Sequence, residues 1–278
     1  MIKIDSHIHF WKYHPIKDAW ITDEMEVLKS DYMPDDLLHQ MNDSGIEQGV
    51  LVQADQSENE NDFLLTIAKQ HASFVAVVGW VDFRSNNIEE RLACYAKNSL
   101  MKGFRHIVQS EPDLNYLLKP SFMNGIALLK KYNFSYDVLI YPKHLDIALE
   151  FCKTLSDQKL IIDHIGKPDI KNRNFTDWKK KIKEFKSMDH VGCKLAGLVT
   201  EADWNHWKVD DFKEVIDFCL SVFGPNRMMF GSDWPVCKVG GSYTQVCAIV
   251  EQHISKLTEL EQAAIWGNTC RDFYNIKP

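Results

Sequence analysis

The chain has 278 residues, of which 45% are hydrophobic and 26% are charged, and its formal net charge is −7 at pH 7. This acidity excludes the basic surface with which proteins bind nucleic acids or anionic membranes, and no run approaches the roughly 18 apolar residues that span a bilayer. The first residues, MIKIDSH, lack the apolar core of a secretory signal. We therefore expect a cytoplasmic protein whose partner is a small molecule, with homo-oligomerisation left open.

Eight β-rich runs follow one another along the chain. Most are short and largely apolar with a polar residue near the end, a pattern typical of strands buried on both faces of a parallel sheet. They cover residues 3–10, 49–54, 74–82, 101–107, 134–140, 159–165, 191–197 and 227–233.

Helical patterns fill the gaps between these runs. Residues 33–45 carry Pro34 near the first turn and Gly45 as a stop signal. Further along, Thr176 is a predicted N-cap for a helix that places Trp178, Ile182 and Phe185 on one stripe. Near the end, Thr258 and Glu261 have the spacing of a capping box. The sequence therefore alternates strand and helix from end to end.

Eight βα units can close into a barrel or open into a doubly wound sheet. The doubly wound alternative requires a glycine-rich turn after the first strand, and SHIHFWK contains no glycine. A (β/α)8 barrel uses roughly 250 residues, nearly the whole chain. We therefore predict one TIM (β/α)8 barrel domain over residues 1–278, of the α/β class.

The seven cysteines, which lie at positions 94, 152, 193, 219, 237, 247 and 270, form no C-x-x-C pair. Their scattered spacing and odd number indicate neither a disulfide framework nor a thiolate zinc site. We expect reduced, mostly buried thiols.

In a barrel of this type the active site lies at the carboxyl ends of the strands, so the polar residues there are the candidates. They are His7, His9, Gln53, Asp82, Arg105, His106, Asp137, His164, Lys194 and Asp233. For Asp82, a structural role in a turn or as a helix cap explains the residue as well as a catalytic role does. The large number of ionisable groups at the strand ends argues against a barrel without activity that serves only as a binding scaffold.

His7 and His9 are separated by one residue, so their imidazoles point to the same face of the first strand. That arrangement suits two ligands of one metal ion or two hydrogen bonds to one substrate oxygen. Asp233, in the turn FGSDWPV, is a candidate general base for water and equally a candidate metal ligand. Both alternatives stay open from these residues alone.

The chain resembles the amidohydrolase superfamily, in particular its amidohydrolase 2 branch, which includes sugar lactonases such as L-fuconolactonase and L-rhamnonolactonase. Five segments in order carry the resemblance: IDSHIHFW, KGFRHIVQ, IDHIGKP, FGSDWPV and GNTCRDFY. It implies a distorted TIM barrel with His7 and His9 after strand 1, His164 after strand 6 and Asp233 after strand 8. Together with Arg105, these residues form the predicted catalytic set.

The departures from the family pattern concern the metal. Metal-dependent relatives add a lysine or glutamate after strand 4 and a histidine after strand 5, where this chain has FRH and YDV. The resemblance therefore implies an enzyme that requires no metal. If one divalent ion such as zinc binds, we expect His7, His9 and Asp233 as its ligands.

The resemblance implies a hydrolase that opens a sugar-acid lactone, of the L-fuconolactone or L-rhamnonolactone type, in sugar catabolism. In this scheme Asp233 takes a proton from the attacking water. For substrate binding we assign Lys17 and Trp20 in the loop after the first strand, and Gln53, Asp137 and Lys194 at other strand ends. The alternative from the same branch is a zinc-dependent non-oxidative decarboxylase.

Overall fold

The computed structural model describes residues 1–277 and contains one eight-stranded parallel sheet whose strands are paired in chain order. The strands are β1 Ile4–Ile8, β2 Gln48–Val52, β3 Phe74–Gly79, β4 Met101–His106, β5 Ser135–Val138, β6 Leu160–Ile162, β7 Val191–Leu195 and β8 Met228–Phe230. Each predicted run coincides with one strand that is shorter than the run, and seven runs contain their strand completely; β2 begins one residue before its run, at Gln48. Sequential order excludes the doubly wound alternative, in which the order reverses.

The sheet closes into a barrel between its first and last strands. Ile8 and Trp234 form a parallel bridge. The amide of His9 donates to the carbonyl of Trp234 over 2.7 Å, and the amide of Asp233 donates to the carbonyl of His7 over 3.0 Å. The predicted TIM barrel is confirmed, and its closing contact brings the catalytic candidates of β1 and β8 side by side.

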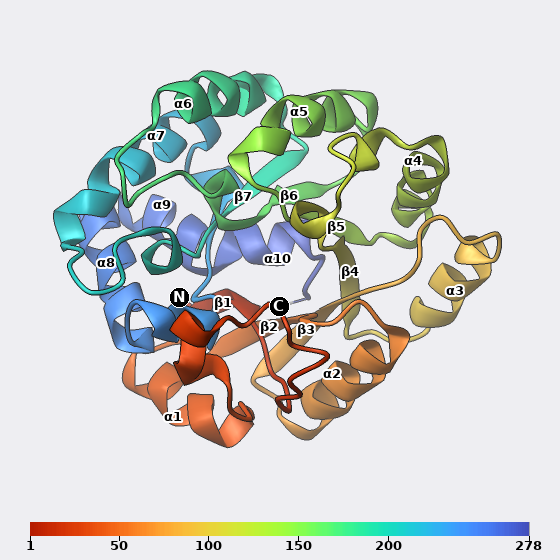
Figure 1. Cartoon of the computed structure of the whole chain (residues 1–278), viewed down its shortest axis with the longest axis horizontal. Coiled ribbons are helices and arrows are strands. Elements are labelled where there is room, and N and C mark those ends of the chain that lie inside the picture. The colour runs from red at the N-terminus through yellow and green to blue at the C-terminus, as the bar shows by residue number, and fades with distance from the viewer. Residues whose placement is uncertain (278) are drawn as a thin grey trace.

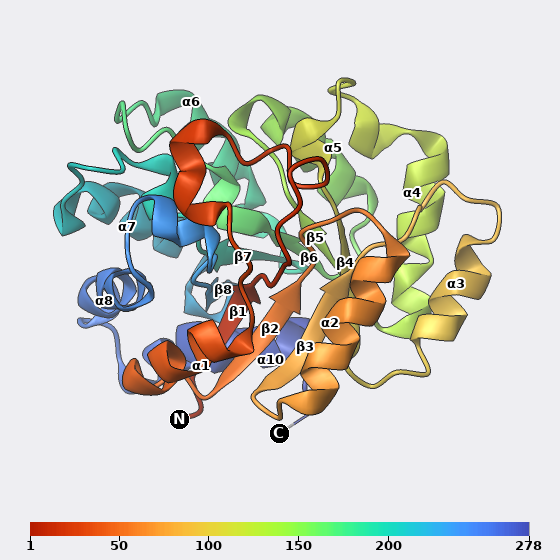
Figure 2. The same cartoon turned by 60° about the horizontal axis from the view of Figure 1, so that its bottom comes forward.

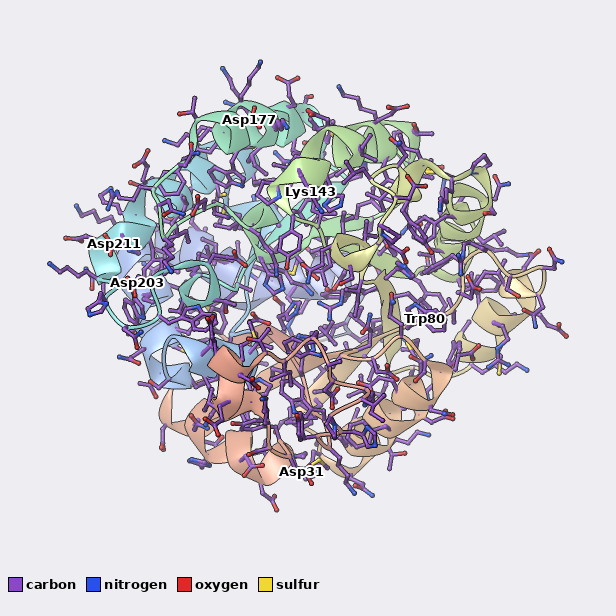
Figure 3. All side chains as sticks on the ribbon, in the orientation of Figure 1. Asp31, Trp80, Lys143, Asp177, Asp203 and Asp211 are labelled. Carbon is purple, nitrogen blue, oxygen red and sulfur yellow. The ribbon has the colours of Figure 1, made fainter. Side chains whose placement is uncertain are left out.

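Helices surround the strands, as Figure 1 shows. Their bounds are α1 Pro34–Asp43, α2 Glu58–Gln70, α3 Ile88–Tyr95, α4 Pro120–Ala127, α5 Leu145–Thr154, α6 Thr176–Ile182, α7 Lys213–Phe223, α8 Tyr243–Ile254, α9 Glu259–Ala263 and α10 Thr269–Phe273. Exposed or half-buried acidic side chains such as Asp177, Asp203 and Asp211 lie along the outer edge of the molecule in Figure 3. The polar groups of the strand ends lie inside this ring of helices.

Most of the local signals in the sequence are confirmed. Pro34 is the first residue of α1 and Gly45 follows that helix with a φ of 68°. The hydroxyl of Thr258 accepts from the amide of Glu261 at the start of α9. Trp178, Ile182 and Phe185 are all buried. The N-cap prediction for Thr176 is wrong, because Thr176 already lies in the first turn of α6 and Phe175 precedes it.

The C-terminal helix closes one end of the barrel, and the segment after β1 covers the other (Figure 2). Cys270, Phe273 and Tyr274 belong to a core cluster with the inward-facing residues of the strands, including Val50 and Val78. Gly192 makes room for this packing, since a Cβ there would lie 2.9 Å from the ring of Phe273. At this second end, where the strands have their carboxyl ends, residues of the segment after β1 line a cavity that a ligand can enter.

Among the described residues the cysteines are all free thiols, and each is buried except Cys94. In the same part of the chain no helix is long and apolar enough to cross a membrane.

Candidate active site

Three histidines and one aspartate converge at the carboxyl ends of the strands. His7 belongs to β1 and His9 follows it, His164 follows β6, and Asp233 follows β8; all four are buried. The Nε2 atoms of His7 and His9 lie 3.1 Å apart. Oδ1 of Asp233 lies 3.8 Å from Nε2 of His7 and 3.6 Å from Nε2 of His9, and its Oδ2 lies 4.0 Å from Nδ1 of His164. The predicted catalytic set is therefore assembled around one point.

A backbone contact fixes the tautomer of His9. Its Nδ1 lies 2.7 Å from the carbonyl oxygen of Val52. Because a carbonyl only accepts, Nδ1 must carry the proton, and the neutral ring then presents an unprotonated Nε2. That nitrogen is the one that lies against His7 and Asp233.

His164 and Asp233 both have left-handed backbone conformations, which β-carbon sterics make rare outside glycine. The φ of Asp233 is 59°, and the segment from His164 to Lys167 has four successive positive values, 54°, 48°, 71° and 52°. Gly197 makes room for this turn: a Cβ there would lie 2.7 Å from Nδ1 of His164. The surrounding structure thus holds strained residues in place at the site, as is common at functional positions.

A layer of buried charges lies directly beneath the histidines. Arg105 donates to Asp163 over 3.0 Å, and Lys194 contacts Asp163 at 3.1 Å and Asp137 at 2.5 Å. The hydroxyl of Tyr274, from the C-terminal end of the chain, lies 2.8 Å from both oxygens of Asp137. Two cations and two carboxylates therefore balance in the barrel interior.

This charged layer contacts His7 on both ring nitrogens. Nζ of Lys194 lies 3.0 Å from Nδ1, and a guanidinium nitrogen of Arg105 lies 3.1 Å from Nε2. Burial and the Lys194 ammonium hold the pKa of His7 well below its ordinary value. His7 is therefore a neutral imidazole at neutral pH.

The pKa values of His164, His9 and Asp233 are also shifted, and all three shifts fix the charge of the group at neutral pH. Burial lowers the pKa of His164 to about 4 and also lowers the pKa of His9. Burial opposes the charge on Asp233, but the three imidazoles, His164 foremost, outweigh it and hold the pKa of this carboxyl well below its ordinary value. At neutral pH the site thus combines neutral imidazoles with a carboxylate.

A cavity of about 250 Å³ opens onto this cluster. Its lining comes from the segment after β1 and from the loops that follow the other strands. It consists of His9, Trp11, Trp20, Met25, Ala54, Arg105, Ile107, Gln109, Ser110, Leu139, Tyr141, His164, Lys167, Thr200, Asp233 and Val236. This mixture of apolar walls and a few polar groups is typical of small-molecule sites.

Of the five predicted substrate-binding residues, only Trp20 lines the cavity. Trp20 is 42% exposed. Lys17 instead lies 3.6 Å from the buried carboxylate of Glu60 on α2. Gln53, Asp137 and Lys194 are fully buried and do not line the cavity. Their direct contact with substrate stays a prediction, and the structure shows them in the layer below.

Sequence reasoning did not select two residues of this layer, Asp163 and Tyr274. Asp163 pairs with both Arg105 and Lys194, and these cations and His7 hold its pKa well below the ordinary value against the effect of burial. It immediately precedes His164 in the segment IDHIGKP, so its place at the end of a strand was a usable signal. Tyr274 lies 137 residues from its partner, and no local pattern links them.

A second cavity, of about 450 Å³, lies between the loops after β7 and β8, beside Trp204 and Trp207. Lys208 is the one charged residue in its lining among the described residues. Because the lining within residues 1–277 carries no carboxylate, imidazole, hydroxyl or thiol, this cavity is not the candidate active site.

Three of the converging residues could hold a metal ion. One donor atom each from His7, His164 and Asp233 lies within 4.8 Å of the others. Ligand atoms around one tetrahedral zinc lie roughly 3.3 Å apart, and zinc prefers neutral imidazole and carboxylate donors. The residues present therefore fit a zinc ion. The third donor is His164, where the sequence indicated His9.

This chain is similar over its full length to proteins of one family. A family model described as amidohydrolase matches residues 4–276. A protein of Burkholderia multivorans named L-fucono-1,5-lactonase is 38% identical over 99% of this chain and 96% of its own length. A second protein of that name, from Burkholderia ambifaria, is 29% identical over 99% of this chain and 96% of its own. A crystal structure of an amidohydrolase from B. multivorans with bound zinc is 37% identical, with a TM-score of 0.96 and full coverage of both chains.

Proposed function

The chain belongs to the amidohydrolase family, and from this premise we propose that it is a lactonase that opens a sugar-acid lactone of the L-fucono-1,5-lactone type. The observation that carries the proposal is the cluster of His7, His9, His164 and Asp233. All but His7 line the cavity of about 250 Å³. The full-length similarity to proteins named L-fucono-1,5-lactonase supports the choice of substrate. We place the reaction in sugar catabolism.

Asp233 activates the water in this proposal. The three histidines hold the pKa of this carboxyl well below its ordinary value, so it is ionised at neutral pH and can accept a hydrogen bond from a water molecule in the cavity. As the water oxygen bonds to the lactone carbonyl carbon, its proton passes to Asp233. The carbonyl π electrons move to the carbonyl oxygen, and a tetrahedral oxyanion forms.

Arg105 and His164 are the donors that stabilise this oxyanion. Both line the cavity, and Nε of Arg105 and Nδ1 of His164 are buried without a hydrogen-bond partner in the described part of the chain. Fixed donors aimed at a developing charge lower the barrier most effectively. The oxyanion then re-forms the carbonyl, the ring C–O bond breaks, and the ring oxygen takes the proton from Asp233.

The buried layer positions these groups. Asp163 holds Arg105 and Lys194 together, and Gln53 donates to the carbonyl of Arg105 over 3.1 Å. We assign Gln53, Asp137 and Lys194 to this supporting role, and Trp20 to stacking against the sugar ring at the cavity wall. To Lys17 we assign a structural role, because its ion pair with Glu60 connects the segment after β1 to α2.

The role of a metal in this mechanism is limited by the charges already present. A zinc ion held by His7, His164 and Asp233 would lower the pKa of a bound water and polarise the carbonyl. However, Arg105 already contacts Nε2 of His7 and Lys194 contacts Nδ1. Two fixed cations oppose a third at that ring, so we propose that catalysis relies on the chain's own residues and requires no zinc.

The alternative of a zinc-dependent decarboxylase has less support. Solved structures named as decarboxylases are 14% identical or less, so they indicate the shared fold alone. No feature of the cavity specifically favours that reaction.

The experiment uses a panel of sugar lactones followed with a pH indicator, because hydrolysis releases one acid group per lactone. Wild-type protein and Asp233→Asn are compared with and without a chelator. We expect acid release by the wild type that the chelator leaves unchanged and that the substitution abolishes. No acid release across the panel would rule out the lactonase, and near wild-type activity in Asp233→Asn would rule out its role as base.

A further inference from the structure

Two polar side chains on the cavity wall take no part in the mechanism above. Gln109 lies in the loop after β4, and Lys167 lies in the loop after β6. Both line the cavity together with Asp233 and His164. Neither belongs to the cluster of histidines or to the charged layer beneath it.

The loop that carries Gln109 is held rigidly. The amide of Gln109 donates to the carbonyl of Leu139 over 3.2 Å. Just before and after it, His106 and Glu111 are joined by a 2.6 Å contact, and the indole of Trp80 donates to the other ring nitrogen of His106 over 3.1 Å. Trp80 is labelled beside β4 in Figure 3. The backbone at Gln109 is therefore fixed before any ligand binds.

The Oε1 atom of the Gln109 side-chain amide is buried and has no hydrogen-bond partner in residues 1–277. Buried amide groups are nearly always paired in folded proteins, and an unpaired one requires an explanation. Since the amide lies at the wall of a cavity, a ligand with hydroxyl groups can supply the missing partner. An amide both donates to and accepts from a hydroxyl.

Lys167 is held three residues after His164, at the end of the same turn. Its amide donates to the carbonyl of His164 over 2.8 Å, and its side chain is only 12% exposed. The ammonium lies 3.5 Å from the carboxylate of Glu201 and 5.1 Å from the centre of the Tyr141 ring. An ammonium has three N–H donors, and one carboxylate contact leaves others for a ligand.

We propose that Gln109 and Lys167 bind the hydroxyl groups of the lactone ring and thereby select a polyhydroxylated lactone over an unsubstituted one. This assignment rests on the proposed lactonase function and adds the residues that determine its specificity. The carbonyl end of the lactone lies at Arg105, His164 and Asp233, and the hydroxylated carbons lie toward Gln109 and Lys167.

The test compares two lactones with the same six-membered ring. L-fucono-1,5-lactone carries hydroxyl groups, and δ-valerolactone carries none. Gln109→Leu and Lys167→Met are measured beside the exposed controls Gln70→Leu and Lys171→Met. Because each lost hydrogen bond, one of them charged, weakens transition-state binding, we expect kcat/KM for the sugar lactone to fall about 10- to 100-fold in the two cavity variants. For δ-valerolactone, and in the controls, kcat/KM stays at the wild-type value.

A loss of equal size on both lactones would show a merely structural role and would overturn the assignment, as would an unchanged kcat/KM for the sugar lactone. Since Lys167→Met leaves Glu201 without its partner, the double variant Lys167→Met with Glu201→Gln keeps the charges balanced and carries the same expectation. A wild-type protein inactive on both lactones would instead overturn the proposed function, and with it this assignment.

Discussion

The space for His164 depends on Gly197, which makes Gly197→Ala a direct test of how the site is positioned. A Cβ at residue 197 would lie 2.7 Å from Nδ1, 2.9 Å from Cγ and 3.0 Å from Cβ of His164. Ordinary contacts of a Cβ begin at 3.4 Å, so the imidazole must move by about 0.7 Å. A displacement of roughly 1 Å in a catalytic group can cost about 100-fold in rate. We therefore expect kcat to fall about 30- to 100-fold.

Gly224→Ala is the matched control for this prediction. Gly197 and Gly224 have nearly the same φ, 65° and 66°, but a Cβ at Gly224 would meet nothing within 4 Å. Both substitutions put a side chain on a backbone with positive φ, and Gly224, with a ψ of 166°, lies in a region that is essentially restricted to glycine. Only Gly197→Ala adds the contact with His164. Steady-state kinetics and thermal unfolding separate the two effects. Wild-type kcat in Gly197→Ala, or an equal loss of kcat in Gly224→Ala, would refute the reasoning.

Three further predictions concern charge and metal. Asp163→Asn leaves Arg105 and Lys194 without their shared carboxylate, so we expect the free energy of unfolding in urea to fall by about 3–5 kcal/mol; an unchanged value would contradict a balanced charge layer. The pKa of His164 is lowered from 6.5 to about 4, so this ring binds a proton more weakly in the folded protein than in the unfolded chain. Its contribution to stability is therefore present above pH 6.5 and is lost as the pH falls toward 4. His164→Gln should therefore flatten the unfolding free energy over that window, and an unaltered slope would argue against a neutral buried ring. Dialysis against a chelator should leave kcat unchanged, and recovery of lost activity by added zinc alone would show that the metal is required.

The eight strands and the place of the catalytic set could be predicted because both depend on local pattern. Short apolar runs specify buried parallel strands, and a barrel brings their carboxyl ends to one mouth. His7, His164 and Asp233 needed only their positions at strand ends to be placed together. The capping error at Thr176 is also local, because a helix can begin one residue earlier than its best cap.

The depth of each side chain within the barrel could not be predicted. Gln53, Asp137 and Lys194 stand at strand ends as His9 and Asp233 do, but they lie in the layer below the cavity. That difference depends on the stagger of neighbouring strands and on partners far apart in sequence. Tyr274 contacts Asp137 across the barrel floor, and such a pairing leaves no trace in a single sequence.

The measurement that tests the central claim most directly is the hydrolysis of L-fucono-1,5-lactone by wild-type protein and by Asp233→Asn, followed by acid release in the presence of a chelator. Asn preserves the size of the side chain and removes the proton acceptor beside the three imidazoles. We predict one proton released per lactone by the wild type and only the spontaneous rate with Asp233→Asn. Acid release by the variant at the wild-type rate, or none by the wild type above the spontaneous rate, would contradict an Asp233-activated lactonase.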